Sequence, residues 1–200
     1  MTCVDHGFIE LNRSFHHLSL DTSGDDEGQL MRAFGRNKSI GWSDLLQERR
    51  VIILSEAGSG KTAEIRNIAS RLRGSGKQAF FLRIEFIVQD FEASFEEGTF
   101  EEFKAWVSSG EEGWLLLDSV DEARLRNPTD FERAIRRVGR ELRPILQQAH
   151  IFITSRSVAW RARTDLQLCR SELPCNPVSR AIGADADDST VNVVGVKSVQ

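Results

Sequence analysis

The sequence has little cysteine, and none of its apolar stretches is long. A membrane-spanning helix needs roughly 20 apolar residues in a row, so we expect no membrane span and no membrane partner. The first residues, MTCVDHGFIE, contain neither the basic nor the apolar segment of a signal peptide. The three cysteines, Cys3, Cys169 and Cys175, form no disulfide framework. Because zinc ligands of other types are absent nearby, we interpret Cys169 and Cys175 as loop thiols of a cytoplasmic protein.

Positive charge is not in excess either. The 26 lysines and arginines are outnumbered by 30 aspartates and glutamates, which gives a net charge of −4. No overall basic field therefore attracts nucleic acid or anionic lipid. Of the 200 residues, 40% are hydrophobic and 28% are charged, and no internal repeat is evident. A chain of this length and composition can bury one hydrophobic core. One globular α/β domain is the natural expectation.

The first 41 residues differ from the rest of the chain. They contain Asp21–Gly28, a polar, acidic and turn-rich stretch that indicates a surface loop or a mobile linker. We therefore divide the chain into an irregular, partly flexible leader over 1–41 and a folded core over 42–200. The core opens with Trp42–Leu46, a short amphipathic segment that we expect to pack beside the first strand.

From residue 50 onward, short apolar runs alternate with helical stretches. This alternation predicts crossover connections, and hence a parallel sheet with helices on its faces. Nearly continuous apolar runs such as Trp114–Leu117 are typical of central strands that are covered on both sides. The sequence therefore predicts a doubly wound α/β fold with a mostly parallel five-stranded sheet. Its expected strands are Val51–Leu54, Ala79–Ile84, Trp114–Leu117, His150–Ile153 and Val191–Val196.

At least three helices are predicted between these strands. The first follows the glycines at 58 and 60 and stops at Gly74-Ser75-Gly76, and the second covers 99–108. The third begins at Thr129, where the T-x-x-E spacing to Glu132 predicts a capping box. This third helix also carries a row of arginines. We interpret the row as a solvated face, in preference to a nucleic-acid or arginine-finger site: Arg133, Arg136, Arg137, Arg140 and Arg143.

Residues 55–62 read SEAGSGKT and follow directly on the apolar run Val51–Leu54. A strand that enters a glycine-rich turn ending in Lys-Thr has the layout of a phosphate-binding loop. The glycines let the chain curl and direct successive N–H groups at an anion, and the following helix adds the positive end of its dipole. Lys61 would contact the β- and γ-phosphates, and the Thr62 hydroxyl would bind Mg²⁺. We assign nucleotide binding to the whole loop: Ser55, Glu56, Ala57, Gly58, Ser59, Gly60, Lys61 and Thr62.

A second group of candidate residues follows the strand Trp114–Leu117. Asp118 stands at the carboxyl end of this strand, where ligands bind in open α/β sheets. It would hold the Mg²⁺ shell opposite Thr62, usually through water. Asp121 and Glu122 follow at the rim, where a carboxylate can orient or deprotonate the attacking water. Apolar runs followed by acids also occur where a strand ends in a solvated loop, but behind a glycine-rich loop we favour the magnesium site.

The third group is the apolar run Ile151–Ile153 with Thr-Ser-Arg after it. In a five-stranded sheet of this kind, this strand can lie between the loop strand and the strand that ends at Asp118. Arg156 would then point toward the γ-phosphate and offset charge that develops in the transition state. The alternative is an exposed arginine in a loop that continues to Asp165. The position at a strand end favours the sensor interpretation.

In this order, SEAGSGKT, LLLDSVDE and FITSR resemble the loop, magnesium and sensor motifs of the NACHT-type ATPases, which belong to the STAND class of signal-transduction ATPases. The specific features are the small residue Ser119 after the magnesium aspartate, the acids Asp121 and Glu122, and the Thr-Ser-Arg sensor. The resemblance covers about residues 40–200, with a further likeness to bacterial members over Trp114–Asp165. It implies a P-loop NTPase three-layer sandwich that binds ATP or ADP with Mg²⁺. ADP would hold a closed monomer, and ATP would permit self-association in signalling or defence.

The sequence departs from this family in two ways. Ser55 replaces the first glycine of the usual pattern GxxxxGK[ST]. Because this position closes the strand and lies away from the phosphates, serine should be tolerated. Family members also continue into a helical lid, a winged-helix domain and repeats, whereas this sequence stops at Gln200. We therefore expect a fragment or a shortened protein, with slow or absent turnover by itself.

Three functions remain open from the sequence. The first is an ATP-binding, slowly hydrolysing switch module, and the second is an interaction scaffold that is nucleotide-locked or nucleotide-free and does not cycle. A small-molecule P-loop kinase is the third, but it would need a basic lid and would rarely have Asp-Ser-x-Asp-Glu after its third strand. No guanine-specific Asn-Lys-x-Asp segment is present, and ATP is favoured through the resemblance. The retained residues favour the first function: Lys61, Thr62, Asp118, Glu122 and Arg156.

Overall fold

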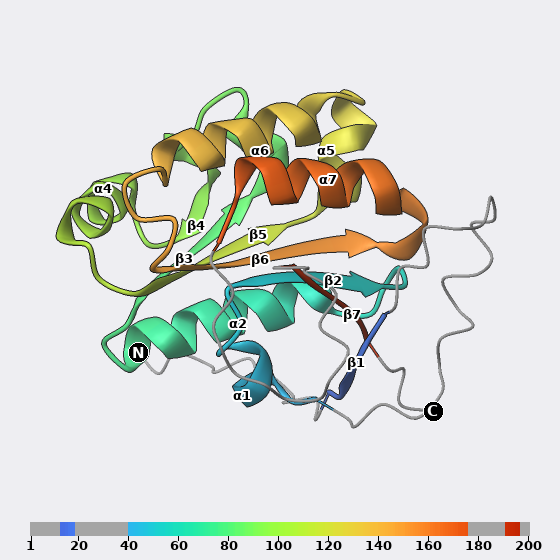
Figure 1. Cartoon of the computed structure of the whole chain (residues 1–200), viewed down its shortest axis with the longest axis horizontal. Coiled ribbons are helices and arrows are strands. Elements are labelled where there is room, and N and C mark those ends of the chain that lie inside the picture. Colours follow the sequence, from blue (N-terminus) through green and yellow to red (C-terminus); the bar gives the residue numbers. More distant parts are fainter. Residues whose placement is uncertain (1–12, 19–39, 176–190, 197–200) are drawn as a thin grey trace, which may run out of the picture.

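The computed structural model describes residues 13–18, 40–175 and 191–196. They form an α/β fold in which the sheet lies between helices on both of its faces (Figure 1). The sheet has seven strands in the order β1-β7-β2-β6-β5-β3-β4. The strands are β1 Phe15–His17, β2 Arg50–Ser55, β3 Gln78–Arg83, β4 Phe95–Glu97, β5 Gly113–Asp118, β6 Ala149–Arg156 and β7 Asn192–Val196. The helices are α1 Trp42–Leu45, α2 Lys61–Gly74, α3 Ile84–Ile87, α4 Phe100–Ser109, α5 Val120–Arg126, α6 Asp130–Glu141 and α7 Ala162–Glu172.

All five strands expected from the sequence are present and run parallel to one another. β2 pairs with β6 and β7, and β5 pairs with β3 and β6. β6 lies between β2 and β5, as predicted. The predicted number of strands is nevertheless wrong, because β1 and β4 pair antiparallel at the two edges and make the sheet mixed. Each has three residues, which is too short for a period of alternating residues to be recognised.

Strand β1 lies within the segment that the sequence predicts to be an irregular leader. Phe15 is 1% exposed, exchanges backbone hydrogen bonds of 2.8 and 2.9 Å with Ile40, and packs edge-to-face on Trp42 of α1. Residues 13–18 and 40–41 are therefore part of the sheet and its packing. The predicted surface loop at Asp21–Gly28 lies outside the described residues.

Strand β2 illustrates how the sequence builds the two sides of the core. All six of its residues are buried. Ile52 and Leu54 belong to the apolar cluster that contains α3 to α7, whereas Val51 and Ile53 belong to the cluster that contains α1 and α2. Successive side chains of a strand point to opposite faces of the sheet. The continuous apolar run is therefore explained by helices that cover both faces (Figure 1).

The predicted helices α2 and α4 are confirmed, and α6 begins where expected but is capped differently. At α4, Thr99 accepts a hydrogen bond from the Glu102 N–H (3.2 Å), and its own N–H donates to the Glu102 carboxylate (2.9 Å). At α6, the Thr129 hydroxyl instead donates to Asn127 Oδ1 (3.0 Å). Glu132 lies 3.8 Å from both Arg124 and Arg161. The capping box predicted at Thr129 is therefore wrong, although the same T-x-x-E spacing forms one at Thr99.

Helices α5 and α7 were not predicted. α5 carries Asp121 and Glu122 in its first turn, and α7 buries Asp165 and Cys169. The interpretation of Cys169 as a loop thiol is wrong, because this side chain is 2% exposed and its burial raises the pKa of the thiol to about 12. No helix in the described ranges has the length and apolarity that crossing a bilayer requires.

The arginine row of α6 faces outward and pairs with nearby acids. Arg133 lies 3.3 Å from Asp130, and Arg136 lies 3.6 Å from Glu172. Arg137 lies 2.8 Å from Glu141 of the same helix. The side chains of these three arginines are 42–60% exposed. This arrangement agrees with the predicted solvated face.

Candidate functional site

The candidate site lies at the carboxyl ends of four neighbouring parallel strands. In the sheet register, Ser55 of β2 is opposite Arg156 of β6, and Asp118 of β5 is opposite Arg83 of β3. Because β6 and β5 are also adjacent, the three predicted motifs end on the same edge of the sheet. This edge is where ligands bind in open parallel sheets.

The glycine-rich loop connects β2 to α2 in the conformation that the sequence predicts. Gly58 and Gly60 have φ values of 71° and 78°, a region that residues with a Cβ avoid. Gly60 is the N-cap of α2. Ser55 closes β2, and its hydroxyl lies 3.1 Å from the Ser59 hydroxyl, which connects the two ends of the loop. The loop residues Glu56 and Ala57 are exposed to solvent, as are both glycines.

Lys61 and Thr62 open the first turn of α2. Burial lowers the pKa of Lys61 from its ordinary value, while the negative charges of Asp121 and Asp118 act to raise it. Arg156 lowers the pKa of Lys61, and Glu122 raises it. The amine of Lys61 is therefore within electrostatic reach of the candidate residues on both other motifs.

Asp118 is completely buried. One of its oxygens, Oδ1, accepts a hydrogen bond from the Thr154 hydroxyl of β6, whose oxygen also accepts the Ser119 N–H at 3.2 Å. The other oxygen, Oδ2, is buried without a hydrogen-bond partner in the described part of the chain. A buried carboxylate oxygen that lacks a partner is costly. Its position at the sheet edge makes it an open ligand for a cation or for an ordered water.

Asp121 and Glu122 point back toward this edge from the first turn of α5. Asp121 is 7% exposed and forms an ion pair with Arg156, whose Nε lies 2.7 Å from Asp121 Oδ2. Ser119, two residues before Asp121, has a φ of 71°, and this turn between β5 and α5 brings both acids over the strand ends. Arg156 is the last residue of β6, so it does not lie in the loop that the alternative interpretation proposed.

Two further arginines lie at the site and were not identified from the sequence. Arg83, the last residue of β3, forms an ion pair with Glu122 and lies 2.7 Å from Glu85. It stands at a strand end, which is the criterion that identified Arg156, so the same criterion would have found it. Arg13 forms an ion pair with Glu64 of α2 and donates to the Ser59 carbonyl of the loop. No sequence signal pointed to Arg13, because its contacts span 46 and 51 positions of the chain.

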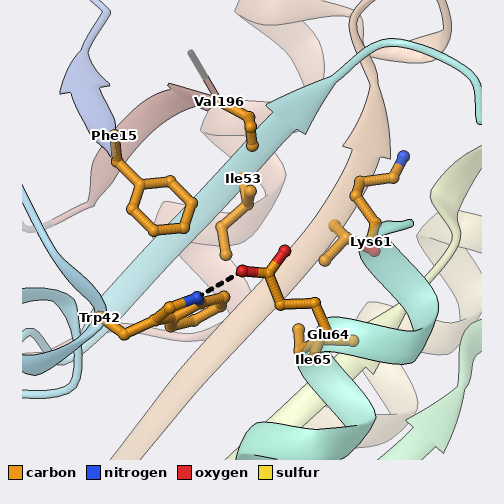
Figure 2. Close-up of a pocket in the computed structure, with 8 residues that line it drawn as sticks. Phe15, Trp42, Ile53, Lys61, Glu64, Ile65 and Val196 are labelled. Atoms are coloured by element: carbon orange, nitrogen blue, oxygen red, sulfur yellow. Dashed lines mark hydrogen bonds between the residues drawn. The ribbon is translucent and has the colours of Figure 1, made fainter. Parts of the chain in front are cut away.

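The contacts of Glu64 close the side of α2 that faces β1 (Figure 2). The Trp42 indole N–H donates to Glu64 Oε1 at 2.8 Å. A cavity of about 10 Å³ lies between these residues and is lined by Phe15 and Val196 among others. The amine of Lys61 points away from the Phe15 and Trp42 rings. Lys61 and Thr154 also line this cavity, so it adjoins the edge that carries the candidate residues.

The donor set fits a phosphate group and a magnesium ion. Positive-φ glycines at the start of a 14-residue helix direct N–H groups outward, and Lys61 supplies a cation beside them. Asp118 Oδ2 offers a free hard oxygen. The described residues contain no group of three or more acidic, histidine or cysteine ligands. Magnesium rarely needs one, since it keeps several waters and takes only one or two carboxylates together with phosphate oxygens.

No protein-family model matches the sequence, and no curated protein matches it either.

Proposed function

We propose that the chain binds a nucleoside triphosphate with Mg²⁺ and hydrolyses it slowly, as a nucleotide-dependent switch module. The observation that carries this proposal is the meeting of Lys61, Asp118 and Arg156 at one sheet edge, with Asp118 Oδ2 buried and unpartnered. The resemblance to NACHT-type STAND ATPases makes ATP and ADP the nucleotides of choice. The P-loop NTPase sandwich, a cytoplasmic location and self-association of a longer protein are parts of the same proposal.

Each candidate residue receives a role that its position allows. The N–H groups of residues 56–62 bind the phosphates, and Lys61 offsets the charge of the β- and γ-phosphates. Thr62 and Asp118 hold Mg²⁺. Arg156 senses the γ-phosphate and offsets charge in the transition state. Glu122, with Asp121 beside it, orients the attacking water.

The second candidate, an interaction scaffold that does not turn over, is favoured by one observation. Both catalytic candidates on α5 already form ion pairs with arginines, Asp121 with Arg156 and Glu122 with Arg83. A triphosphate must compete with Asp121 for Arg156 before that arginine can reach a γ-phosphate. Release of phosphate by the wild type, and a much slower release by Glu122→Gln, separates the switch from the scaffold.

The binding claim is tested by titrating the wild type and Lys61→Ala with a fluorescent ATP analogue and Mg²⁺. Loss of one charge-assisted contact to phosphate should weaken binding by about 10-fold or more, since such contacts contribute roughly 1.5–3 kcal/mol. Lys104→Ala removes an exposed lysine of α4 that lies over the Phe100 ring, and it should bind like the wild type. Equal affinity of Lys61→Ala and Lys104→Ala would refute nucleotide binding at this loop. Chelation of Mg²⁺ should weaken wild-type binding but not that of Asp118→Asn.

A further inference from the structure

Arg83 stands among more carboxylates than one guanidinium can neutralise. Its Nη2 forms an ion pair with Glu122 and lies 2.7 Å from Glu85, and its Nη1 lies 3.6 Å from Glu96. The Arg83 side chain is 21% exposed. Burial acts to lower the pKa of Arg83, but the charges of Glu122 and Glu85 raise it above its ordinary value. The guanidinium therefore stays charged and holds its acids firmly at neutral pH.

Two of these three acids form a second ion pair, whereas Glu122 forms none other within the described ranges. Glu85 lies 3.4 Å from Arg126, and Glu96 lies 3.4 Å from Arg66 of α2. Among the described residues, Arg83 is the one cation that contacts Glu122, through Oε2. The Glu122 side chain is 35% exposed, so without this contact its several rotatable bonds are free to sample solvent-facing rotamers.

The register explains why Arg83 can act on this site. β3 and β5 are adjacent and parallel, and Arg83 is opposite Asp118. The guanidinium thus extends from the same sheet edge that carries the candidate magnesium ligand. It contacts the Glu122 carboxylate of α5 from β3, whereas Arg156 contacts Asp121 from β6, on the other side of β5 in the sheet.

We propose that Arg83 is a positioning residue for Glu122: it fixes one carboxylate oxygen of Glu122 so that the other faces the attacking water. This inference rests on the proposed function, because it assigns a task to Arg83 in the hydrolysis step. Arg83 itself does not touch the nucleotide. Its removal therefore lowers the rate of hydrolysis and leaves nucleotide binding unchanged. A displacement of about 1 Å in a catalytic group can cost roughly 100-fold in rate.

The test compares Arg83→Gln, Arg83→Lys and Arg66→Gln. Arg83→Gln removes the charge, Arg83→Lys keeps a charge with a different shape, and Arg66→Gln is the matched control. Arg66 belongs to the same ion-pair network through Glu96 and Glu97 but does not contact Glu122. For each variant we would measure single-turnover phosphate release and the Kd of ATP with Mg²⁺, together with the midpoint of thermal unfolding.

We expect Arg83→Gln to release phosphate about 10- to 100-fold more slowly, with the Kd of ATP unchanged. Arg83→Lys should restore part of the rate, and Arg66→Gln should match the wild type. The decisive measurement is the double variant Arg83→Gln/Glu122→Gln. Because Arg83 acts through Glu122, the Arg83→Gln change should have no further effect on the rate once Glu122 is glutamine.

Other outcomes overturn the inference in distinguishable ways. If Arg83→Gln slows phosphate release by the same factor in the wild type and in Glu122→Gln, Arg83 does not act through Glu122. An equal loss in Arg66→Gln means that the network has only a structural role. If Arg83→Gln does not fold, Arg83→Lys carries the test, and a wild-type rate in that variant contradicts the need for a guanidinium at this position. A wild type that binds ATP without turnover refutes this inference but not nucleotide binding, whereas a wild type without binding refutes the proposed function as well.

Discussion

At the scale of single residues, Ser119 shows where the chain accepts strain to form the site. Among the described residues it is the one non-glycine with a positive φ, 71°. It follows Asp118 directly, and its N–H donates to Thr154 Oγ1 at 3.2 Å. Strained backbone tends to collect where function requires a particular geometry. Here the strained turn bends the chain from β5 into α5 and places Asp121 and Glu122 over the strand ends.

Ser119 therefore reverses the usual stability order of alanine and glycine. We expect Ser119→Gly to be more stable than Ser119→Ala by about 1 kcal/mol, because only glycine adopts this φ without a Cβ clash. Urea denaturation of the two variants measures the difference. The matched pair Ser108→Gly and Ser108→Ala, on the exposed face of α4, should follow the ordinary helical order, in which alanine is the more stable. A Ser119→Ala variant more stable than Ser119→Gly would contradict the strained turn.

At the scale of elements, the contacts of Glu64 join β1, α1 and α2. The Glu64 carboxylate accepts a hydrogen bond from Trp42 of α1 and pairs with Arg13, which lies two residues before β1. Burial raises the pKa of Glu64 above its ordinary value of 4.5, although the hydrogen bond from Trp42 and the charge of Arg13 both act to lower it. The cost of burying the charge is therefore larger than the gain from its partners.

This balance predicts a pH dependence with a definite sign. With the folded pKa raised, the contribution of Glu64 to stability is fully present below about pH 4.5 and is lost as the pH rises through the folded value. Glu64→Gln keeps an acceptor for Trp42 and does not titrate. The stability of Glu64→Gln relative to the wild type should therefore increase from acidic to neutral pH in urea denaturation. A decrease would show that the Arg13 ion pair outweighs the cost of burial.

The helix starts show how far local pattern determines an element. Thr99 and Thr129 both have a glutamate three residues later, and both precede a helix in the structure. Only Thr99 forms the capping box. At Thr129, Asn127 accepts the hydroxyl, and Glu132 turns toward Arg124 and Arg161. The sequence predicted both helices correctly, but the tertiary contacts of the side chains decided which box formed.

At the scale of the whole molecule, Arg50 connects parts of the chain that are distant in sequence. It is the first residue of β2 and is 3% exposed. Its guanidinium donates to the carbonyls of Leu146, Leu173 and Pro174 at 2.8, 2.8 and 3.1 Å. Burial lowers the pKa of Arg50 to about 10, so it remains charged at neutral pH. The start of β2 is thereby fixed to the approach to β6 and to the end of α7.

We expect Arg50→Met to lower the free energy of unfolding by about 3 kcal/mol, because it leaves several buried carbonyls without a donor. Arg49→Met is the matched control. Arg49 is the preceding residue and also donates to a carbonyl, that of Gln148 at 3.0 Å, but its side chain is 24% exposed. It should lose about 1 kcal/mol. If urea denaturation shows the same loss of unfolding free energy in the two variants, the buried contacts of Arg50 stabilise the fold no more than the exposed contacts of Arg49.

The sequence by itself determined the five parallel strands, the turn from β2 into α2 and the position of each motif at a strand end. These follow from local rules: apolar runs form covered strands, glycines permit positive φ, and polar residues after a strand lie at its carboxyl edge. Only the tertiary structure decided the pairing of charges at that edge. Arg13, Arg83 and Arg156 each select an acid from an element that is distant in sequence. The attraction between two charges depends on their distance and surroundings, so the choice of partner depends on which strands are neighbours, and that order exists only in the folded sheet.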